Sequence, residues 1–483
     1  MPSYPGFVGG SAPSQSMIAT SERTVNWYSE KIGTEGPQHK SALYPTPGFA
    51  GWNPIAAADL GGRAALSIDN RTFVMMGAGL YQAAAAMTLT KLQTLAQDNN
   101  LAQMVYNGPT GGQLCIATGT NGYNYTIATN VLTTVLVGEA TQVGMLDEYF
   151  LALNSVTGKL RLSNLNDGTT WDPTQFALRS AQPDPWLAMI INAPDIWLLG
   201  EQTGDIWYDA GTSPFPLAAR QGLTIPYGIA APFSLAVTGG EVFWLTKNKD
   251  GAGLVVRANG YNPQPISTVE LATALSHYQR TSTIADAEAL VYQQEGHTFY
   301  VLRFPAANAT WAYDLTTGQW AERGKWNSLR GDYDIWAPRI HTYAFGQHLT
   351  GDASTGTLSV MDITNGSELD GTAIRRLRRG PLLINEHQRL PLRRFEVLVE
   401  TGLGLQSGQG SNPQMMFRAS SDGGKTFGNE RSMGVGQVGQ YRKRAFVTRL
   451  GSPRMWVPEI SVSDPVPYRI IDAYLNNDYA GAA

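Results

Sequence analysis

The sequence has one cysteine, few charged residues and no long apolar run. Because Cys115 is the only cysteine of the 483 residues, the chain cannot form an internal disulfide. Cys115 lies in the strand-like phrase LCIATG, where a small buried hydrophobe is favoured over a catalytic thiol. Charged residues make up 15% of the chain, against about a quarter in an average soluble protein. A surface with so few charges is typical of a protein that neighbouring chains cover.

The motifs of membrane insertion, metal binding and catalysis are also missing. No stretch approaches the roughly 18 apolar residues of a membrane-spanning helix. The first thirty residues lack the basic and apolar regions of a secretory signal, so none is expected. His341 and His348 are seven residues apart in a strand-rich region, and we do not expect them to share an ion. No Gly-x-Ser-x-Gly turn, convincing carboxylate pair or complete phosphate-binding loop is present. We therefore expect no catalytic residue, no cofactor and no metal site.

What the sequence does contain is a repeated pair of strands. Seven times between residues 66 and 361 an apolar strand is followed within sixteen residues by an apolar or aromatic partner, across a Gly, Asn or Asp turn. The first strands begin near Leu66, Leu114, Phe150, Ile196, Val242, Phe299 and Thr342. Their partners begin near Leu80, Tyr123, Leu160, Ile206, Leu254, Trp311 and Leu358. The mean spacing from 66 to 342 is 46 residues, which is the period of a β-propeller blade.

The repeat divides the chain into three predicted parts, all of β structure. Residues 57–370 are expected to form a β-propeller of about seven blades. Residues 1–56 are rich in Gly, Pro and Ser and are expected to form an extended arm. Residues 371–483 have longer strands and broader loops, which are typical of a β-sandwich-like domain or of one elaborated blade plus a strand that closes the ring.

Two segments between blades are predicted to be helical, and one part of the arm is predicted to bind a neighbour. The candidate helices are Thr88–Asp98 and, with a better pattern, Val269–Ser282. The phrase RTVNWYSE alternates like a strand, and an arm of this kind is expected to lie along the propeller or a neighbouring subunit. Its residues Asn26, Trp27 and Tyr28 are therefore candidate interface residues.

The positive charge is concentrated near the carboxyl end. Residues 371–483 carry 16 Lys+Arg and 9 Asp+Glu, a net charge of +7, which leaves −11 for the rest of the chain. The most concentrated group is Arg375, Arg376, Arg378 and Arg379, with Arg389, Arg393 and Arg394 close behind. All of these except Arg389 are candidate interface residues. Arginine favours bidentate contacts to carboxylates and phosphates. This group has three interpretations: a solvated basic face, a subunit interface that docks on an acidic neighbour, or a contact to DNA phosphates.

One further phrase, SSDGGKTF, fits the Asp-box pattern of a β-hairpin. The defined positions are Ser420, Asp422, Gly424, Thr426 and Phe427. In such a box the Asp carboxylate accepts hydrogen bonds from backbone amides, the glycine permits the turn and the aromatic ring packs below it. Asp-boxes occur in sialidases but lie far from the catalytic residues, so this single copy predicts a structural hairpin.

Both ends of the chain resemble one known family. RTVNWYSE and SALYPTPGFAGW near the start are similar to the opening of the packaged-DNA stabilisation family, the tail hub or nozzle proteins of short-tailed double-stranded-DNA phages. RASSDGGKTF, YRKRAFVTRLG and SVSDPVPYRIIDA are similar in kind to later segments of that family. The blades between match by pattern alone.

This resemblance implies a virion structural protein, not an enzyme, that is made in the host cytoplasm. Its copies would form a ring, commonly a hexamer, below the portal and its adaptor or head-completion protein. The ring would continue the DNA channel, retain the packaged genome until infection, and carry tailspikes or fibres and a needle or plug. Double-stranded DNA would pass without specific binding, and an acidic lumen would repel its phosphates. The −11 body suits such a lumen and the +7 end suits a docking surface.

Two other functions remain open from the residues alone. A carbohydrate-binding or sialidase-like propeller would have a pocket of Arg, Glu and Tyr side chains on its axis. A generic scaffold of the kelch type would be a monomer.

Overall fold

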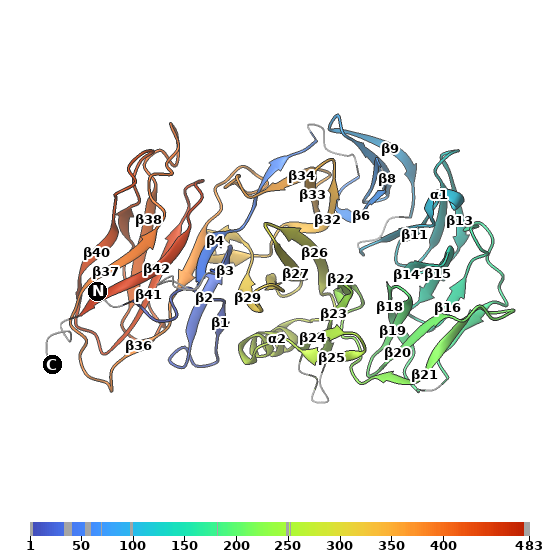
Figure 1. The fold of residues 1–483 in the computed structure, drawn as a ribbon, viewed down its shortest axis with the longest axis horizontal. Helices are drawn as coiled ribbons and strands as arrows, with labels where there is room; N and C mark the ends of the chain where they lie inside the picture. Colours follow the sequence, from blue (N-terminus) through green and yellow to red (C-terminus); the bar gives the residue numbers. More distant parts are fainter. Residues whose placement is uncertain are drawn as a thin grey trace.

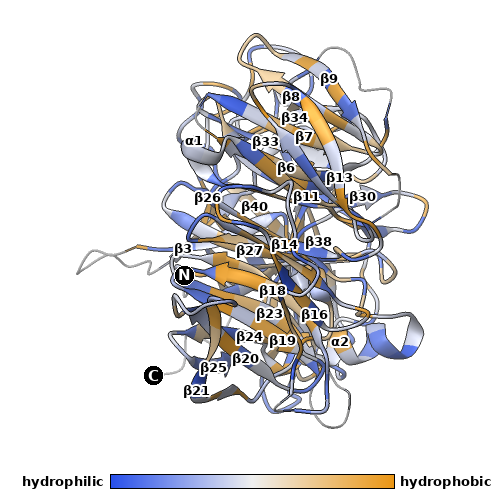
Figure 2. Ribbon diagram, turned by 90° about the vertical axis from the view of Figure 1, so that its right-hand side faces the viewer, coloured by the Kyte–Doolittle hydropathy of each residue, from blue (hydrophilic) through white to orange (hydrophobic). Residues whose placement is uncertain are grey.

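The chain forms a seven-bladed β-propeller joined to a β-sandwich (Figure 1). The computed structural model describes residues 3–32, 41–53, 59–68, 70–96, 100–180, 182–247, 251 and 253–477. Within these ranges no helix has the length and apolar character needed to cross a membrane. Hydrophobic residues lie along the strands in the interior of the chain (Figure 2).

Each blade is a four-stranded antiparallel sheet whose first strand lies nearest the propeller axis (Figure 1). Blade one contains β6 (Gly62–Ile68), β7 (Arg71–Met76), β8 (Gly79–Ala84) and β9 (Thr88–Thr94). Blade two contains β10 (Gln103–Tyr106), β11 (Gln113–Ala117), β12 (Gly122–Thr126) and β13 (Val131–Leu136). Blade three contains β14 (Gln142–Leu146), β15 (Tyr149–Asn154), β16 (Lys159–Leu162) and β17 (Phe176–Ala177).

The remaining blades repeat this order, except that the last borrows a strand. Blade four contains β18 (Trp186–Asn192), β19 (Asp195–Gly200), β20 (Gly204–Asp209) and β21 (Leu217–Ile225). Blade five contains β22 (Ala236–Thr238), β23 (Glu241–Lys247), β24 (Gly253–Asn259) and β25 (Asn262–Pro265). Blade six contains β26 (Glu288–Gln294), β27 (His297–Phe304), β28 (Ala309–Asp314) and β29 (Gln319–Glu322). Blade seven contains β32 (Pro338–Ala344), β33 (Gln347–Asp352), β34 (Leu358–Asp362) and, from the arm, β5 (Gly48–Gly51).

The blades form a closed circle. Each innermost strand contacts the innermost strand of the next blade, and β32 contacts β6 to complete the ring. β5 pairs antiparallel with β34, with Phe49 opposite Met361, so the arm supplies the outer strand of the last blade. Closure by an early strand removes the need for a closing strand from the carboxyl-terminal region. That region forms the predicted sandwich instead.

The sandwich consists of two sheets that both include arm strands. The first sheet contains β2 (Ser21–Val25), β35 (Arg376–Arg379), β41 (Met455–Val462), β38 (Gln414–Ser420) and β39 (Arg431–Gly434), with β1 (Ala12–Pro13) beside β2 and β36 (Leu383–Ile384) beside β41. The second contains β3 (Trp27–Lys31), β4 (Ser41–Pro45), β42 (Ile470–Asn477), β37 (Leu392–Val399) and β40 (Ala445–Gly451). Trp27, Phe395, Phe417 and Trp456 are buried in the core between them.

The arm therefore connects the two parts of the protein. β2 pairs with β29 of blade six at Val25 and Glu322 and with β35 of the sandwich, which makes one continuous sheet of the two bodies. The single strand predicted over RTVNWYSE is in fact two strands, because Asn26 has a left-handed backbone, with a φ of 59°. This break directs β2 into the first sandwich sheet and β3 into the second.

One of the two predicted helices is present. α2 (Val269–Thr281) lies between blades five and six, and its N-cap Thr268 accepts a hydrogen bond from the Leu271 amide. The helix predicted over Thr88–Asp98 is wrong: Thr88–Thr94 is the outer strand β9 of blade one, and Asp98 lies outside the described residues. Threonines 88, 90 and 94 favour an extended backbone. Two short elements, α1 (Gly108–Gly111) and the 3-10 helix η1 (Pro232–Ser234), and the hairpin β30 (Lys325–Asn327) and β31 (Asp332–Asp334) complete the structure.

Candidate functional site

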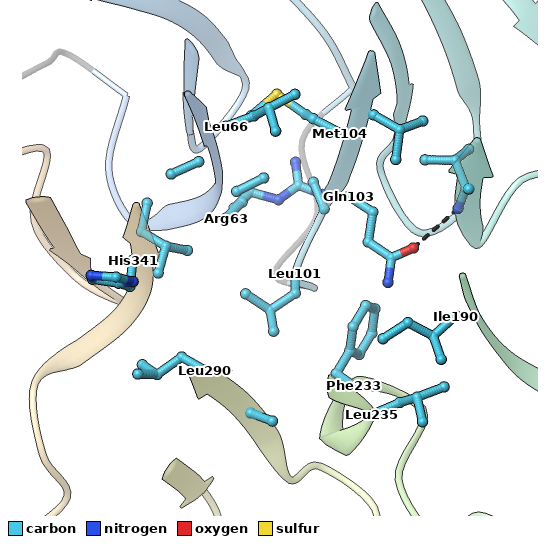
Figure 3. Close-up of a pocket in the computed structure, with 18 of the residues that line it drawn as sticks. Arg63, Leu66, Leu101, Gln103, Met104, Ile190, Phe233, Leu235, Leu290 and His341 are labelled. Atoms are coloured by element: carbon cyan, nitrogen blue, oxygen red, sulfur yellow. Dashed lines mark hydrogen bonds between the residues drawn. The ribbon is translucent and has the colours of Figure 1, made fainter. Parts of the chain in front are cut away.

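A cavity of about 680 Å³ lies on the propeller axis between the inner strands (Figure 3). Its labelled lining is mostly apolar: Leu66, Leu101, Met104, Ile190, Phe233, Leu235 and Leu290, with Arg63, Gln103 and His341 as polar members. The described residues that line it include no Asp, Glu, Ser, Thr, Cys or Lys. The axial glutamate that a sialidase-like pocket requires is therefore not among them.

The polar side chains of the inner strands hold neighbouring blades together. The Gln103 Oε1 accepts a hydrogen bond from the Val143 amide at 3.0 Å, and the Gln142 Oε1 accepts one from the Met189 amide at 2.6 Å. Both glutamines stand at the first position of an inner strand, so the contact repeats from blade to blade. Each satisfies a buried amide and fixes the register of adjacent blades. These polar side chains on the inner strands therefore stabilise the packing of neighbouring blades.

The same kind of bridge is made by an arginine between blades one and two. Arg63 is 2% exposed, and its guanidinium donates to the carbonyls of Asn100, Gly77 and Thr118 at 2.8, 3.0 and 2.8 Å. This buried guanidinium therefore has a structural role: its donors are used by backbone carbonyls, and it connects blade one to blade two.

His341 and His348, which were not expected to share an ion, lie side by side. The His341 Nε2 and the His348 Nδ1 are 3.0 Å apart across the β32–β33 hairpin. Burial and the neighbouring His348 lower the pKa of His341 to about 4, so the pair is neutral at pH 7. Among the described residues no group of three or more His, Cys, Asp or Glu side chains could hold a metal ion.

Two of the arginines predicted to form an interface lie inside the chain. Arg378 is completely buried and donates to the carbonyls of Phe7, Gly6 and Gly10 at 2.6, 2.7 and 3.0 Å. It also pairs with Glu22 at 2.7 Å. Arg378 thus binds the arm to the sandwich, and a docking role on the outer surface does not apply to it.

Arg376, the second of these, lies at the joint between sandwich and propeller. It is 1% exposed and donates to the Thr46 carbonyl at 3.2 Å. Burial lowers its pKa to about 10. The adjacent Asn26 side chain donates to the carbonyls of Gly324 and Arg375 at 2.7 and 2.9 Å and accepts from the Gly324 amide at 3.0 Å. Asn26 is also buried, so it connects the two bodies of one chain.

Trp27 and Tyr28 point to opposite sides of β3. Trp27 is fully buried in the sandwich core. Tyr28 packs against the propeller, where its ring contacts His297 and Phe299 with centroid distances of 4.9 and 5.4 Å. The interface that these two residues and Asn26 form is therefore the internal one between propeller and sandwich.

The other four arginines are nearer the surface. Arg375 pairs with Glu430 at 2.6 Å and lies over the Trp326 ring. Arg379 pairs with Glu459 at 2.7 Å, and Arg394 with Glu396 at 2.9 Å. Arg393 is exposed. For these four a contact to another subunit stays a prediction.

The Asp-box has the hydrogen bonds that its sequence predicts. The Asp422 carboxylate accepts from the amides of Lys425 and Thr426 at 3.0 and 2.9 Å and from the Thr426 hydroxyl at 2.6 Å. The Ser420 hydroxyl donates to Asp422 at 2.6 Å and accepts from the Gly424 amide at 2.8 Å. The Phe427 ring lies below the guanidinium of Arg379 at 4.6 Å. The box is a folded turn between β38 and β39.

The sequence did not reveal a buried carboxylate, Glu368, near the joint between sandwich and propeller. Glu368 is 4% exposed, and burial raises its pKa from 4.5 to about 7, although Lys325 and Arg376 oppose the change. Because the folded state holds this proton more tightly than the unfolded chain, stability falls as the pH rises from 4.5 to 7.

We expect the substitution Glu368→Gln to leave stability unchanged at pH 4 and to increase it at pH 8. The amide copies the shape of the protonated acid, so the penalty removed at pH 8 is up to about 3 kcal/mol. Thermal and urea unfolding at both pH values measure this difference. The matched control is Glu295→Gln on an exposed turn. Two results would contradict the raised pKa of Glu368: an equal increase in stability for both variants at pH 8, or an increase for Glu368→Gln at pH 4 as large as that at pH 8.

Two family models match the chain. The model described as "Bacteriophage P22 Gp10, beta-propeller" matches residues 30–366, and the model described as "Bacteriophage P22 Gp10, beta-sandwich" matches residues 375–476. Together they span both bodies of the structure. No curated protein matches the sequence.

The solved structures to which the chain is similar include three of low sequence identity and low TM-score. The N-terminal domain of Nup159 is 11% identical with a TM-score of 0.40, over 71% of this chain and 99% of that one. The streptogramin B lyase is 8% identical with a TM-score of 0.42, over 65% and 97%. The computationally designed Ika8 protein is 10% identical with a TM-score of 0.38, over 65% and 99%.

Proposed function

The chain belongs to the bacteriophage P22 Gp10 family and is a structural protein of the phage tail hub, and from this membership we propose that it extends the portal channel, retains packaged DNA and releases it on infection. Copies of the chain would form a ring, and six is the number that the family resemblance implies. In this role the protein performs no chemistry and acts through its shape and contacts.

The observation that best supports this proposal is the way the arm joins the two bodies into one unit. β5 closes the propeller, β2 continues blade six into the sandwich, and Arg378 fastens the start of the arm with buried hydrogen bonds. A part of a pressurised conduit must transmit force between its neighbours without coming apart. A continuous sheet and a closed ring resist such force better than two domains on a flexible linker.

The charge distribution agrees with a channel through which DNA slides. Residues 1–370 carry a net charge of −11, and an acidic wall repels the phosphates of the duplex. Arg376 and Arg378, the centre of the basic run, are buried inside the chain. They are therefore withheld from DNA that passes by.

The proposed partners are those of a hub. One face of the ring would bind the portal adaptor or head-completion protein, the periphery would carry tailspikes or fibres, and the far end would hold a needle or plug. The protein would be made in the bacterial cytoplasm and would function in the virion. Double-stranded DNA would pass through the lumen without specific binding.

The test compares phage particles assembled with and without this chain. We expect particles that lack it to package DNA and then lose it, so that more than about nine tenths of the genomes become sensitive to nuclease. Adding the purified chain to freshly filled heads that carry the adaptor should restore protection. Full protection without the chain, or a chain that never binds the adaptor ring, would contradict the proposal. Turnover of a glycan by the purified chain would favour the carbohydrate-active alternative.

A further inference from the structure

The far end of the sandwich carries a basic strip in which Arg444 alone forms an ion pair with another described residue. We define the basic strip as β39, β40 and residues 435–444 between them. From Arg431 to Gly451 the sequence contains five basic residues and no acidic one: Arg431, Arg442, Lys443, Arg444 and Arg449. All five are exposed, and Arg444 pairs with Glu396 at 2.6 Å.

The strip also exposes apolar side chains. Tyr441 is 71% exposed, Val438 is 46% exposed and Phe446 is 42% exposed. The Arg394 guanidinium lies 3.8 Å from the centroid of the Phe446 ring, so it holds the ring on the surface. Aromatic and Arg side chains in one exposed patch are characteristic of protein interfaces.

The strip is held in shape by hydrogen bonds. The Gly439 amide donates to the Gly402 carbonyl at 3.1 Å, and the Val435 amide donates to the Pro413 carbonyl at 3.0 Å. The Arg431 guanidinium donates to the Thr448 carbonyl at 2.6 Å, which ties β39 to β40. β40 is the last strand of its sheet, so its outer edge has no neighbour within the described chain. A pre-formed edge with apolar and basic side chains can bind a partner at low entropic cost.

An acidic patch of matching character lies on blade three. We define the acidic patch as the β14–β15 turn with the β16–β17 loop, and its carboxylates are Asp147, Glu148, Asp167 and Asp172. Residues 140–158 and 163–178 contain no Lys or Arg. Glu148 accepts a hydrogen bond from the Asn166 side chain, so the turn and the loop form one surface. Leu165, which is 53% exposed, adds apolar area to the same loop.

The two surfaces lie at opposite ends of the molecule. In Figure 1, β40 is at one end of the long axis and β16 is at the other. A surface at one end that complements a surface at the other produces head-to-tail contacts, which close into a ring when the rotation permits. We propose that the basic strip docks on the acidic patch of the next copy of this chain, an inference that rests on the ring of the proposed function.

A second copy fits the strip better than DNA does. The strip presents a tyrosine, a phenylalanine and a valine together with its charges, and these apolar groups require a partner that is partly apolar. The acidic patch offers that combination, whereas phosphates offer charge alone. The basic strip and the acidic patch lie at opposite ends of the chain. Each copy would therefore bind the next one in the same head-to-tail orientation.

The experiment uses two complementary charge-reversed chains. Arg442→Glu with Lys443→Glu reverses the strip, and Asp147→Lys with Glu148→Lys reverses the patch. Each variant alone places like charges in contact, and we expect association on the order of 100-fold weaker than that of the wild type. An equimolar mixture restores opposite charges at every interface if the two variants alternate. Mass photometry of the mixture should therefore show even-numbered rings that neither variant forms alone.

The controls separate this inference from the proposed function. Arg71→Glu with Arg280→Glu reverses two exposed charges elsewhere and should assemble like the wild type. Circular dichroism and melting of each variant identify any chain that fails to fold, and recovery on mixing excludes that explanation. Rings from either variant alone would overturn the docking inference and leave the hub function standing. A wild type that remains a monomer with the adaptor ring would overturn both. Retention of a 30-base-pair DNA duplex by the wild type but not by the strip variant, with ring formation unchanged, would assign the strip to DNA and overturn the docking inference.

Discussion

Replacing Arg378 by Met should release the start of the arm and destabilise the protein by about 3–5 kcal/mol. Met has a similar length, so the loss reflects charge and hydrogen bonds more than volume. The guanidinium donates to three backbone carbonyls and the Thr24 hydroxyl and pairs with Glu22. Without it the Phe7 carbonyl is buried and unpaired, which has a desolvation cost, and the carbonyls of Gly6 and Gly10 lose their donor.

Limited proteolysis and urea unfolding measure this effect together. The variant should be cut within residues 3–24 at a protease concentration that leaves the wild type intact, and its unfolding midpoint should fall. Arg378→Lys keeps the charge but has three donors for five contacts, so it should be intermediate. Arg442→Met, on an exposed site, should resemble the wild type within about 0.5 kcal/mol. Equal cleavage of Arg378→Met and wild type would show that the arm is held elsewhere.

The second large effect is expected at the strand that closes the propeller. Phe49 on β5 is 3% exposed and packs with Tyr28, Tyr292 and Met361. Gly48 beside it lies so close to the chain after β34 that a Cβ there would be 2.4 Å from the Asn365 carbonyl oxygen. Phe49→Ala leaves a cavity in this tightly packed closure, and such changes cost about 3–5 kcal/mol.

Hydrogen exchange locates the loss. In Phe49→Ala the amides of β34 and β32 should exchange faster, while those of blades two to four should change little, since their contacts are intact. Leu60→Ala removes a side chain that is 60% exposed and is the control. Uniform acceleration across all blades would mean that β5 is not a local closure, and no change would mean that the ring closes without it.

The sequence predicted the blades through their middle strands. All seven predicted partner strands lie in the third strand of a blade, and each places buried apolar side chains such as Leu80, Leu160 and Ile206 in the propeller core. The innermost strands of blades two to six were missed. Those of blades two and three are short and begin with Gln103 and Gln142, whose polar side chains bind the neighbouring blade. The outer strand β9 was mistaken for a helix, since it is largely exposed and has no buried face to give it a period of two.

The location of the candidate interface arginines could not be predicted from the residues next to them in the sequence. The run from Arg375 to Arg379 has four arginines in five residues, which is the composition of a surface segment. Its partners Glu22 and Thr46 lie more than 320 residues earlier. Burial of a charge depends on such distant partners, so the identity of the fold could be predicted while the location of these side chains could not. Asn26 is a similar case, because its left-handed backbone is required only by the divergence of two sheets.

Synthesis imposes an order on this fold. β5 emerges from the ribosome early, but its partner β34 follows about 300 residues later, which at about 5–20 residues per second is a delay of roughly 15–60 s. During that interval neither blade seven nor the sandwich sheets are available for the arm strands to pair with. The last blade and the sandwich can mature only after nearly the whole polypeptide exists, so truncated chains from interrupted translation should lack the finished shape and be excluded from virions.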